Sequence, residues 1–283
     1  METKDLLKKV RKIEIKTRRL SDHIFGGEYQ STFKGKGMTF SEVRQYQIGD
    51  DVRAIDWNVT ARYNEPYIKV FEEEREQTLM LMVDVSGSKF FGTTDVFKNE
   101  YVTEIAATLS FSANQNNDKI GLILFTDIIE LYIPPKKGKT HILRIIRELL
   151  EFKPTSKKTD IHFAFKFLSN VQKNKSIVFI ISDFISHDYF KSLKISSSKH
   201  DITGIRIFDK GEESIPNLGL IQVIDSETGD ISTINTSSSK VRSSYKKQYL
   251  SNIKIFEDNF KRSGAGVINC GTHDSYVKKL LGY

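Results

Sequence analysis

Cysteine is almost absent from this sequence of 283 residues, which contains only Cys270. A single cysteine excludes an intrachain disulfide and a metal site built from several thiolates, and it favours a reducing compartment. Long apolar runs are missing too, and no apolar segment follows the basic start of the sequence. We therefore expect neither secretion nor a transmembrane segment, and we expect a cytoplasmic location.

The signatures of several enzyme classes are also missing. The sequence has no Gly-x-x-x-x-Gly-Lys-Ser/Thr loop for nucleotide phosphates. Its histidines are scattered and form no zinc-like pair; they are His23, His141, His162, His187, His200 and His273. A magnesium-dependent hydrolase or phosphoryl-transfer enzyme is therefore an alternative function and not the leading one.

Positive charge is in moderate excess, with 43 Lys and Arg against 36 Asp and Glu. Residues 1–22 carry eight basic and four acidic residues, and their apolar residues recur at near-helical spacing. This pattern predicts an amphipathic helix. We favour a packed helix with a solvated basic face, because a nucleic-acid or membrane-surface helix would be expected to interleave aromatic residues. A basic nucleic-acid-binding protein is the weaker alternative, and no specific nucleic-acid motif supports it.

Apolar runs and helical periodicity alternate after Thr78, which predicts an α/β fold. Strands are predicted at residues 79–83, 120–125, 177–181, 202–208 and 266–269. Helices are predicted near residues 97–109, 141–150, 161–168, 244–262 and 273–281. Strands separated by helices pair in parallel, so we expect a doubly wound, mostly parallel sheet with its ligands beyond the carboxyl ends of the strands.

Residues 128–133 predict one antiparallel strand, because only two residues separate them from the preceding strand. That connection is too short for a parallel crossover, so the strand belongs at an edge of the sheet. Pro134 and Pro135 are expected to end it. Residues 220–224 and 231–234 predict two further strands that form a hairpin.

The change in hydrophobic periodicity near Thr78 divides the chain into two parts. We expect residues 1–78 to form the N-terminal helix and a segment with short strands, and residues 79–283 to form the α/β domain. The N-terminal part is expected to pack on the main domain, because it contains too many aromatic residues to leave exposed. These aromatic residues are Tyr29, Phe33, Phe40, Trp57 and Phe71.

The loop after the first predicted strand carries a candidate metal site. The sequence Asp84-Val85-Ser86-Gly87-Ser88 places one carboxylate and two hydroxyls on a tight turn, where glycine allows close approach. Oxygen ligands of this kind suit a hard cation such as Mg²⁺, or Mn²⁺. Because hydroxyl ligands add no negative charge, the bound ion would stay electrophilic and could accept a carboxylate from outside.

This loop resembles the Asp-x-Ser-x-Ser motif of the metal-ion-dependent adhesion site (MIDAS) in von Willebrand factor A domains and integrin I domains. That site also uses a threonine at the start of a later helix and an aspartate after a later strand. Thr159 and Asp183 match these two positions. The resemblance implies a von Willebrand factor A-like fold and a metal site made of Asp84, Ser86, Ser88, Thr159 and Asp183. Ser86, Ser88 and Thr159 would contact the metal directly, and the two aspartates directly or through water.

Lys89 departs from the family pattern, in which many members have a small or apolar residue after the second serine. Its ammonium group would compete with the ion or tune it. A second interpretation of the loop is a polar turn without metal, with Thr159 as the N-cap of the following helix.

Residues 40–57, which include Gly49-Asp50-Asp51-Val52-Arg53-Ala54-Ile55-Asp56-Trp57, resemble the hallmark of a second family. This is a bacterial family of uncharacterised proteins with an A-like domain, often encoded beside MoxR-type AAA+ ATPases. Gly49-Asp50-Asp51 predicts a turn, Arg53 and Asp56 are placed to pair, and Trp57 is expected to be an apolar anchor. We favour a structural role for this motif over a recognition surface beside the metal site.

The leading function is a non-enzymatic interaction module. The metal would bind an Asp or Glu of a protein partner, and the family context implies a MoxR-type AAA+ ATPase or its client. The A-domain resemblance also implies that the closing helices move when the partner binds.

Overall fold

The computed structural model describes residues 39–72, 77–87, 98–186, 188–225 and 229–282. These residues form two compact units, 39–72 and 77–282, and each is described by itself. The predicted helix of residues 1–22 lies outside the described residues, as do Tyr29 and Phe33. Packing of the N-terminal part on the main domain stays a prediction.

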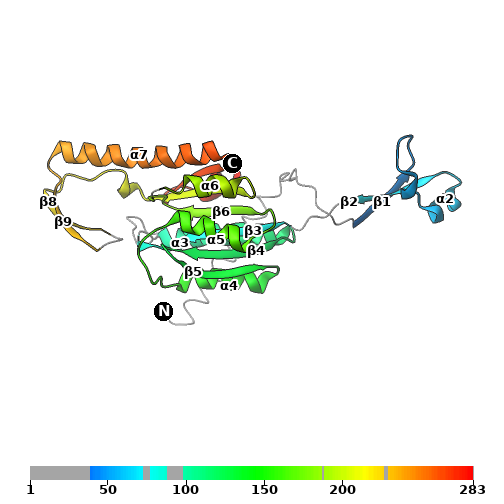
Figure 1. Cartoon of the computed structure of the whole chain (residues 1–283), viewed down its shortest axis with the longest axis horizontal. Coiled ribbons are helices and arrows are strands. Elements are labelled where there is room, and N and C mark those ends of the chain that lie inside the picture. Colours follow the sequence, from blue (N-terminus) through cyan, green and yellow to red (C-terminus); the bar gives the residue numbers. More distant parts are fainter. Residues whose placement is uncertain (1–38, 73–76, 88–97, 187, 226–228, 283) are drawn as a thin grey trace. The chain divides into compact units, whose positions relative to one another are not determined.

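The larger unit is built on a six-stranded sheet with the order β10-β7-β6-β3-β4-β5 (Figure 1). Its strands are β3 (Thr78–Asp84), β4 (Lys119–Phe125), β5 (Ile129–Lys136), β6 (Ile177–Ser182), β7 (Asp201–Phe208) and β10 (Gly266–Gly271). All neighbouring strands are parallel except β4 and β5, which are antiparallel. The predicted fold class, a mostly parallel α/β sheet with one antiparallel edge strand, is confirmed.

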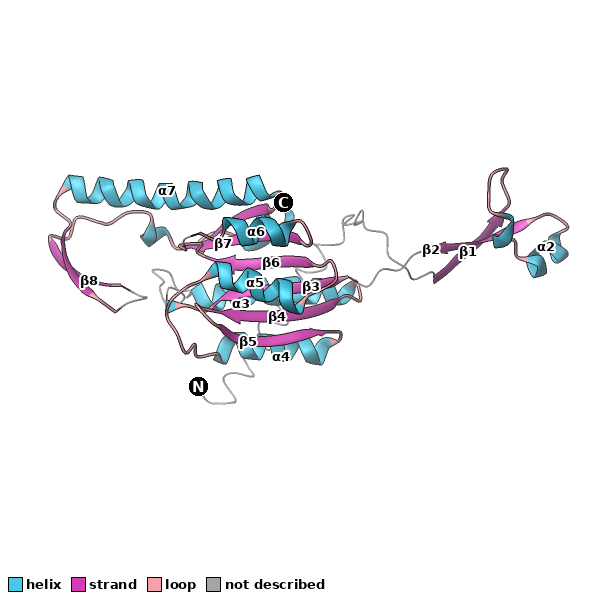
Figure 2. Ribbon diagram, in the orientation of Figure 1, coloured by secondary structure: helices cyan, strands magenta, loops and turns pink. Residues whose placement is uncertain are grey.

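Helices cover both faces of this sheet (Figure 2). One face packs against α3 (Lys98–Gln115), α4 (Lys139–Glu151) and α8 (Tyr276–Leu281). The other packs against α5 (Ile161–Val171), α6 (Phe190–Ser197) and α7 (Ser239–Ser263). Alternate residues of β3 therefore enter different cores, Leu81 one and Met82 the other. A strand buried on both faces reads as a continuous apolar run, which is why it was recognisable in the sequence.

Close packing of α7 on β7 depends on a glycine. A Cβ atom at Gly204 would lie 2.5 Å from Cε1 of Phe260 and 3.0 Å from Cε2 of Phe256, both on α7. Both aromatic side chains are buried. Gly204 therefore lets this long helix lie directly over the strand, next to the carboxyl end of the sheet.

The edge strand differs from the prediction at its end. β5 continues to Lys136 and includes Pro134 and Pro135, so the expectation that the prolines end the strand was wrong. An edge strand has ladder partners on one side alone, so it tolerates residues that lack a backbone N–H.

Two smaller elements complete the larger unit. β8 (Leu220–Ile224) and β9 (Ile231–Asn235) pair antiparallel as a separate two-stranded sheet, as the hairpin prediction requires. Leu220, Ile224 and Ile231 of this hairpin are exposed.

The helix α6 was not predicted. Among the described residues, no helix is long and apolar enough to cross a membrane.

The smaller unit is an antiparallel pair of strands, β1 (Thr39–Gln45) and β2 (Tyr67–Glu72). The connection between them contains a short 3-10 helix, η1 (Val52–Ala54), and α2 (Trp57–Tyr63). Asp56 caps α2 by accepting hydrogen bonds from the backbone N–H groups of Asn58 and Val59. The short strands predicted for this segment are therefore present.

Candidate metal centre

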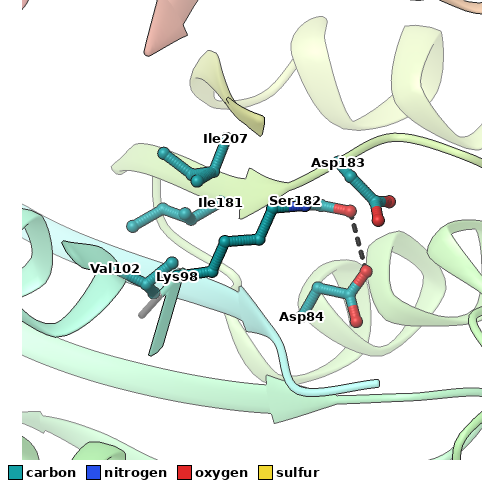
Figure 3. A pocket seen from close by; sticks show the side chains of 7 residues that line it. All are labelled: Asp84, Lys98, Val102, Ile181, Ser182, Asp183 and Ile207. Carbon is teal, nitrogen blue, oxygen red and sulfur yellow. Dashed lines mark hydrogen bonds between the residues drawn. The ribbon is translucent and has the colours of Figure 1, made fainter. Parts of the chain in front are cut away.

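Asp84 is the last residue of β3 and lies where the carboxyl ends of two parallel strands meet. β3 pairs with β6, and in their register Val83 is opposite Ile181. The next residues of the two strands are therefore neighbours. Ser182 donates a hydrogen bond of 2.7 Å from Oγ to Oδ2 of Asp84 (Figure 3). The backbone N–H of Ser86 donates to Oδ1 at 2.9 Å, so the nearly buried carboxylate is held from both sides.

The metal loop is tied to the segment that precedes α5. The backbone N–H of Gly87 donates to the carbonyl oxygen of Lys157 at 3.1 Å. The N–H of Asp160 donates to the carbonyl oxygen of Thr126 at 3.0 Å, next to the end of β4. These two bonds bring half-buried Thr159 to the same edge of the sheet as Asp84.

Thr159 is not the N-cap of α5. That position belongs to Asp160, whose carboxylate accepts a hydrogen bond from the backbone N–H of Phe163. Among the described residues, the hydroxyl of Thr159 has no hydrogen-bond partner. The hydroxyl is therefore available to a ligand. If Thr159 were the N-cap, its hydroxyl would instead be bonded to the backbone of the helix.

Asp183 follows β6 on a strained turn. The next residue, Phe184, has a φ of 58°, a left-handed conformation that is unusual for a bulky side chain. The turn is held by packing, because the ring of Phe184 is buried and stacks on Phe256 at 4.2 Å. The carboxylate of Asp183 accepts a hydrogen bond of 3.1 Å from the N–H of Ile185. Strained residues often occur at functional sites, and this one directly follows Asp183.

The two aspartates lie close enough to influence one another. Burial, and then the negative charge of Asp183, raise the pKa of Asp84 to about 7, although hydrogen bonds from Ser86 and Ser182 act in the opposite direction. Within the described part of the chain, neither aspartate forms an ion pair with a lysine or arginine. Two adjacent carboxylates without a cationic side chain favour the binding of a cation.

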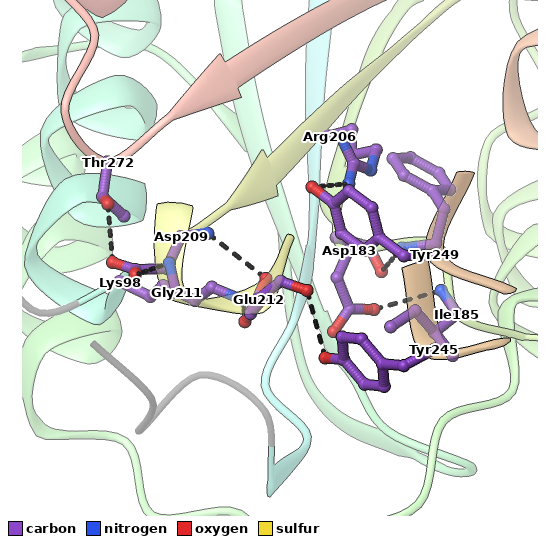
Figure 4. Close-up of polar contacts among 12 residues, drawn as sticks. Lys98, Asp183, Ile185, Arg206, Asp209, Gly211, Glu212, Tyr245, Tyr249 and Thr272 are labelled. Atoms are coloured by element: carbon purple, nitrogen blue, oxygen red, sulfur yellow. Dashed lines mark hydrogen bonds and ion pairs between the residues drawn. The ribbon is translucent and has the colours of Figure 1, made fainter. Parts of the chain in front are cut away.

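A buried lysine lies beside this pair but is directed to another acid. Lys98, at the start of α3, lines a small cavity of about 30 Å³ together with Asp84, Ser182 and Asp183 (Figure 3). Its ammonium group binds the carboxylate of Glu212, and Glu212 in turn accepts from the N–H of Asp209 (Figure 4). Lys98 is thus neutralised by Glu212.

The donors present fit a hard cation. Asp84, Ser86, Thr159 and Asp183 offer carboxylate and hydroxyl oxygens at one edge of the sheet, and Mg²⁺ prefers such ligands. Among the residues that the structure describes, no group of three or more His, Cys, Asp or Glu is arranged to hold a metal, so a zinc-type cluster is not found there. Ser88 of the predicted loop and Lys89, which follows it, lie outside the described residues.

Three residues in or beside the candidate metal centre were not identified from the sequence. The hydrogen bond of Ser182 to Asp84 was not anticipated. Lys98 and Glu212 are 114 positions apart, so no local sequence pattern predicts their ion pair. The position of Ser182 at the end of a predicted buried strand, next to Asp183, could have indicated that it lies at the site.

The acidic residues of the second motif serve local structure. Asp50 accepts two hydrogen bonds from the guanidinium group of Arg44, at 2.7 and 2.8 Å. Asp51 caps η1 by accepting from the N–H of Arg53. These contacts agree with the structural role that the sequence favoured.

One detail predicted for this motif was wrong. Asp56 pairs with Lys69 at 3.4 Å and not with Arg53, because β2 brings the lysine beside the helix cap. The anchoring role predicted for Trp57 stays a prediction, because within the smaller unit its side chain is 69% exposed. A two-stranded unit has too little interior to cover an indole ring.

The chain was compared with known protein families and sequences. A family model described as "Protein of unknown function DUF58" matches residues 42–254. The uncharacterized protein Rv1480 of Mycobacterium tuberculosis is 26% identical over 223 residues, which cover 78% of this chain and 70% of the relative. The uncharacterized protein YeaD of Bacillus subtilis is 29% identical over 109 residues, covering 38% and 25% of the two chains.

Solved structures with a similar arrangement were also found. A crystal structure of an aerotolerance-related membrane protein from Bacteroides fragilis covers 73% of this chain and 100% of its own, with 14% identity and a TM-score of 0.48. The hypothetical protein BatB from Bacteroides thetaiotaomicron covers 73% and 96%, with 12% identity and a TM-score of 0.46. The SpRpn10 VWA domain covers 73% and 94%, with 10% identity and a TM-score of 0.40.

Proposed function

This chain belongs to the family described as protein of unknown function DUF58, and on that premise we propose that it is a protein-interaction module whose metal centre binds a carboxylate of a partner. Mg²⁺, or Mn²⁺ in its place, would be held by Asp84, Ser86, Thr159 and Asp183, together with Ser88 from outside the described residues. When bound, the ion supplies an electrophilic position that an external carboxylate can occupy.

The observation that carries this proposal is the pair of aspartates. Asp84 is almost buried, its charge is opposed by that of Asp183, and no lysine or arginine of the described residues pairs with either. An arrangement of this kind is unfavourable without a cation, because like charges repel more strongly where water is scarce. The nearby hydroxyls of Ser86 and Thr159 complete a set of oxygen donors.

The chain's own residues supply orientation. Ser182 and the N–H of Ser86 fix the carboxylate of Asp84, and the N–H of Ile185 fixes that of Asp183. Preorganised donors lower the entropic cost of binding, since the side chains need not be ordered when the ion and the partner arrive. The role is binding and not catalysis.

The partner of the proposal is a protein that presents an exposed Asp or Glu. The resemblance of residues 40–57 to proteins encoded beside MoxR-type AAA+ ATPases points to such an ATPase, or to one of its clients. One buried cysteine suits a reducing compartment, so the proposal places the complex in the cytoplasm.

Thermal unfolding tests the metal centre. We expect Mg²⁺ or Mn²⁺ to raise the melting temperature of the parent, because an ion that binds the folded state alone stabilises it by about 2.7 kcal/mol at one hundred times its Kd. Asp84→Asn and Thr159→Ala should abolish this rise. Asp201→Asn is the matched control, since Asp201 is exposed at the opposite end of the sheet, at the start of β7. If neither ion changes the melting temperature of the parent, the proposed metal centre is refuted.

A pull-down tests the function itself. The parent and Ser86→Ala would be used as bait, each with magnesium and with EDTA, and the retained proteins identified by mass spectrometry. The proposal requires a partner that is retained by the parent with magnesium and lost in the other three conditions. A partner retained equally in all four would show that the metal centre is not the contact.

A further inference from the structure

A groove of about 300 Å³ adjoins the candidate metal centre. It shares Asp183 and Gly87 with the centre and is bounded by residues of β7, β8 and α7, among them Arg206, Tyr245 and Tyr249 (Figure 4). A volume of this size is at the lower end of the range for ligand sites and suits a few residues of a peptide. Whatever binds the metal position from outside would therefore have this groove beside it.

Arg206 is the unusual residue of the groove. Its side chain is buried, and its guanidinium lies 4.6 Å from the ring centroid of Phe208 and 5.3 Å from that of Tyr249. It donates a hydrogen bond of 2.9 Å to Oη of Tyr249 and a long one of 3.5 Å to Oδ1 of Asn269. No carboxylate of the described residues pairs with it.

A guanidinium group carries five N–H donors, and the two contacts above leave most of them unused. Burying a charge without an opposite charge is costly, and aromatic stacking offsets only part of that cost. Arginine is also the residue best suited to bind a carboxylate with two parallel hydrogen bonds. The geometry of this group therefore matches an acidic ligand from outside the chain.

The other charges of the groove do not satisfy Arg206. Glu212 lines the groove, but its carboxylate is bound by Lys98 and by the N–H of Asp209. Asp183 belongs to the metal centre, where an ion would offset its charge. With the ion in place, the groove therefore presents an excess of positive charge at Arg206.

The sheet register sets the spacing between Arg206 and the metal centre. Arg206 lies opposite Ser182 on the neighbouring strand β6, and Ser182 binds Asp84 on the next strand, β3. Strands are about 4.8 Å apart, so the two positions are separated by roughly one to two strand spacings, or about 5–10 Å. In an extended peptide, side chains at positions i and i+2 project on the same side about 7 Å apart. This spacing fits two acidic residues separated by one residue.

We propose that Arg206 is a second anchor that binds another Asp or Glu of the same partner segment, two residues from the one at the metal. The proposal rests on the proposed function of the metal centre. The ligand is an acidic, extended protein segment, and exposed Ile224 of the β8–β9 hairpin, which lines the groove, offers it an apolar contact. Arg206 thus selects partners with the pattern acidic-x-acidic.

Two synthetic peptides test this anchor. One is Gly-Asp-Ser-Glu-Gly and the other Gly-Asp-Ser-Gln-Gly, both acetylated and amidated, so that they differ by one carboxylate. Affinities would be measured by NMR titration of the full chain with magnesium and with EDTA, because this method also quantifies weak binding. With magnesium, the parent should bind the two-carboxylate peptide roughly tenfold tighter, the size expected of a charge-assisted bidentate contact. The Nε–Hε signal of Arg206 should shift with that peptide alone.

Three variants identify the residue responsible. Arg206→Gln should remove the preference, so that the two peptides bind with equal affinity. Arg206→Lys keeps the charge but not the planar fork, so it should retain a reduced preference, and it keeps the test valid if the glutamine variant does not fold. Arg262→Gln is the matched control, because Arg262 is also an arginine stacked on an aromatic ring, Phe190, but is exposed and does not line the groove.

The outcomes separate the anchor from the metal centre. A full preference in folded Arg206→Gln and Arg206→Lys, or equal binding of both peptides by the parent, would overturn the anchor. If EDTA changes neither affinity while Arg206→Gln still removes the preference, the metal-dependent function fails and the anchor stands. If EDTA weakens both peptides and the Arg206 variants change nothing, the metal centre stands and the anchor fails.

Discussion

The hydroxyl of Ser182 donates a 2.7 Å hydrogen bond to the carboxylate of Asp84, although the two residues are 98 positions apart in the chain. The parallel pairing of β3 with β6 creates this contact at the carboxyl edge of the sheet. The same hydroxyl also accepts a hydrogen bond from the N–H of Phe184, at 3.0 Å. One small side chain therefore links the carboxylate of Asp84 to the turn that follows Asp183.

Ser182→Ala should destabilise the protein and weaken its response to magnesium. The change leaves an oxygen of Asp84 and the N–H of Phe184 without their partner, which should cost roughly 1–3 kcal/mol of unfolding free energy. Urea unfolding with magnesium and with EDTA would measure both effects. Ser198→Ala removes the hydroxyl of an exposed serine at the end of α6, which donates to the carbonyl oxygen of Ile195, and should change neither quantity. Equal unfolding free energies of the Ser182→Ala variant and the parent would contradict the role of this hydroxyl.

The ion pair of Lys98 and Glu212 should show strong coupling. The side chain of Lys98 is 4% exposed and that of Glu212 is 22% exposed, so removing either partner leaves a poorly hydrated charge. We expect Glu212→Gln to cost about 3 kcal/mol or more, and Lys98→Met/Glu212→Gln to cost clearly less than the two single changes added together. A double-mutant cycle of unfolding free energies would measure this, and strict additivity would argue against the pair.

Gly204→Ala should loosen the packing of α7 on the sheet. The added Cβ would meet the ring of Phe260 at 2.5 Å, and overpacking of this kind costs roughly 1–3 kcal/mol. Adding Phe260→Leu to Gly204→Ala should cause less additional loss than Phe260→Leu causes in the parent, because the smaller side chain gives space for the methyl group. Because Tyr245 and Tyr249 also lie on α7, the change should in addition weaken peptide binding in the groove. Unchanged stability of Gly204→Ala would show that the helix can shift freely.

His200 should make the protein sensitive to mild acid. Its ring is buried, Nδ1 is paired with the hydroxyl of Ser176 at 3.0 Å, and Nε2 has no hydrogen-bond partner among the residues that the structure describes. Burial, and secondarily the charge of Lys199, lower the pKa of His200 to about 4. The unfolded chain binds this proton near pH 6.5, so the stability associated with neutral His200 is present above that pH and is lost as the pH falls toward 4.

Unfolding free energies of the parent and of His200→Gln, measured from pH 7.5 to pH 4, test this. The parent should lose up to about 3 kcal/mol more than the variant over this range. His162→Gln is the control, because His162 is exposed. Parallel pH profiles of parent and His200→Gln would rule out the contribution.

Much of the fold could be predicted because its signals are local. Residues 79–83 are apolar because helices cover β3 on both faces, and the periodic residues Ile142, Ile145, Ile146 and Leu149 mark the buried side of α4. The helix α6 gave no such signal. It has eight residues, of which Ser192, Leu193 and Ser196 are buried, and this is too short and too polar for a period to emerge.

The smaller unit shows where local reasoning fails. An arginine and an aspartate three positions apart, Arg53 and Asp56, suggested a pair, but strand pairing brought Lys69 to Asp56. An aromatic residue suggested an apolar anchor, and the two-stranded unit by itself leaves Trp57 exposed. Composition indicates which residues can pair or be buried, and the neighbours supplied by the rest of the chain decide whether they do.

The sequence by itself determined the alternation of strands and helices, the antiparallel edge strand, and the location of Asp84 and Asp183 at strand ends. These follow from hydrophobic periodicity and from the geometry of parallel connections, which act over short stretches of chain. The tertiary structure alone decided the bond of Ser182 to Asp84, the neutralisation of Lys98 by Glu212, and the burial of Arg206 among described residues that offer it no acidic partner. Each of these depends on which strands and helices become neighbours in the fold. Hydrogen bonds and ion pairs form only between groups in contact, and hydrophobic periodicity does not say which residues far apart in the sequence come into contact.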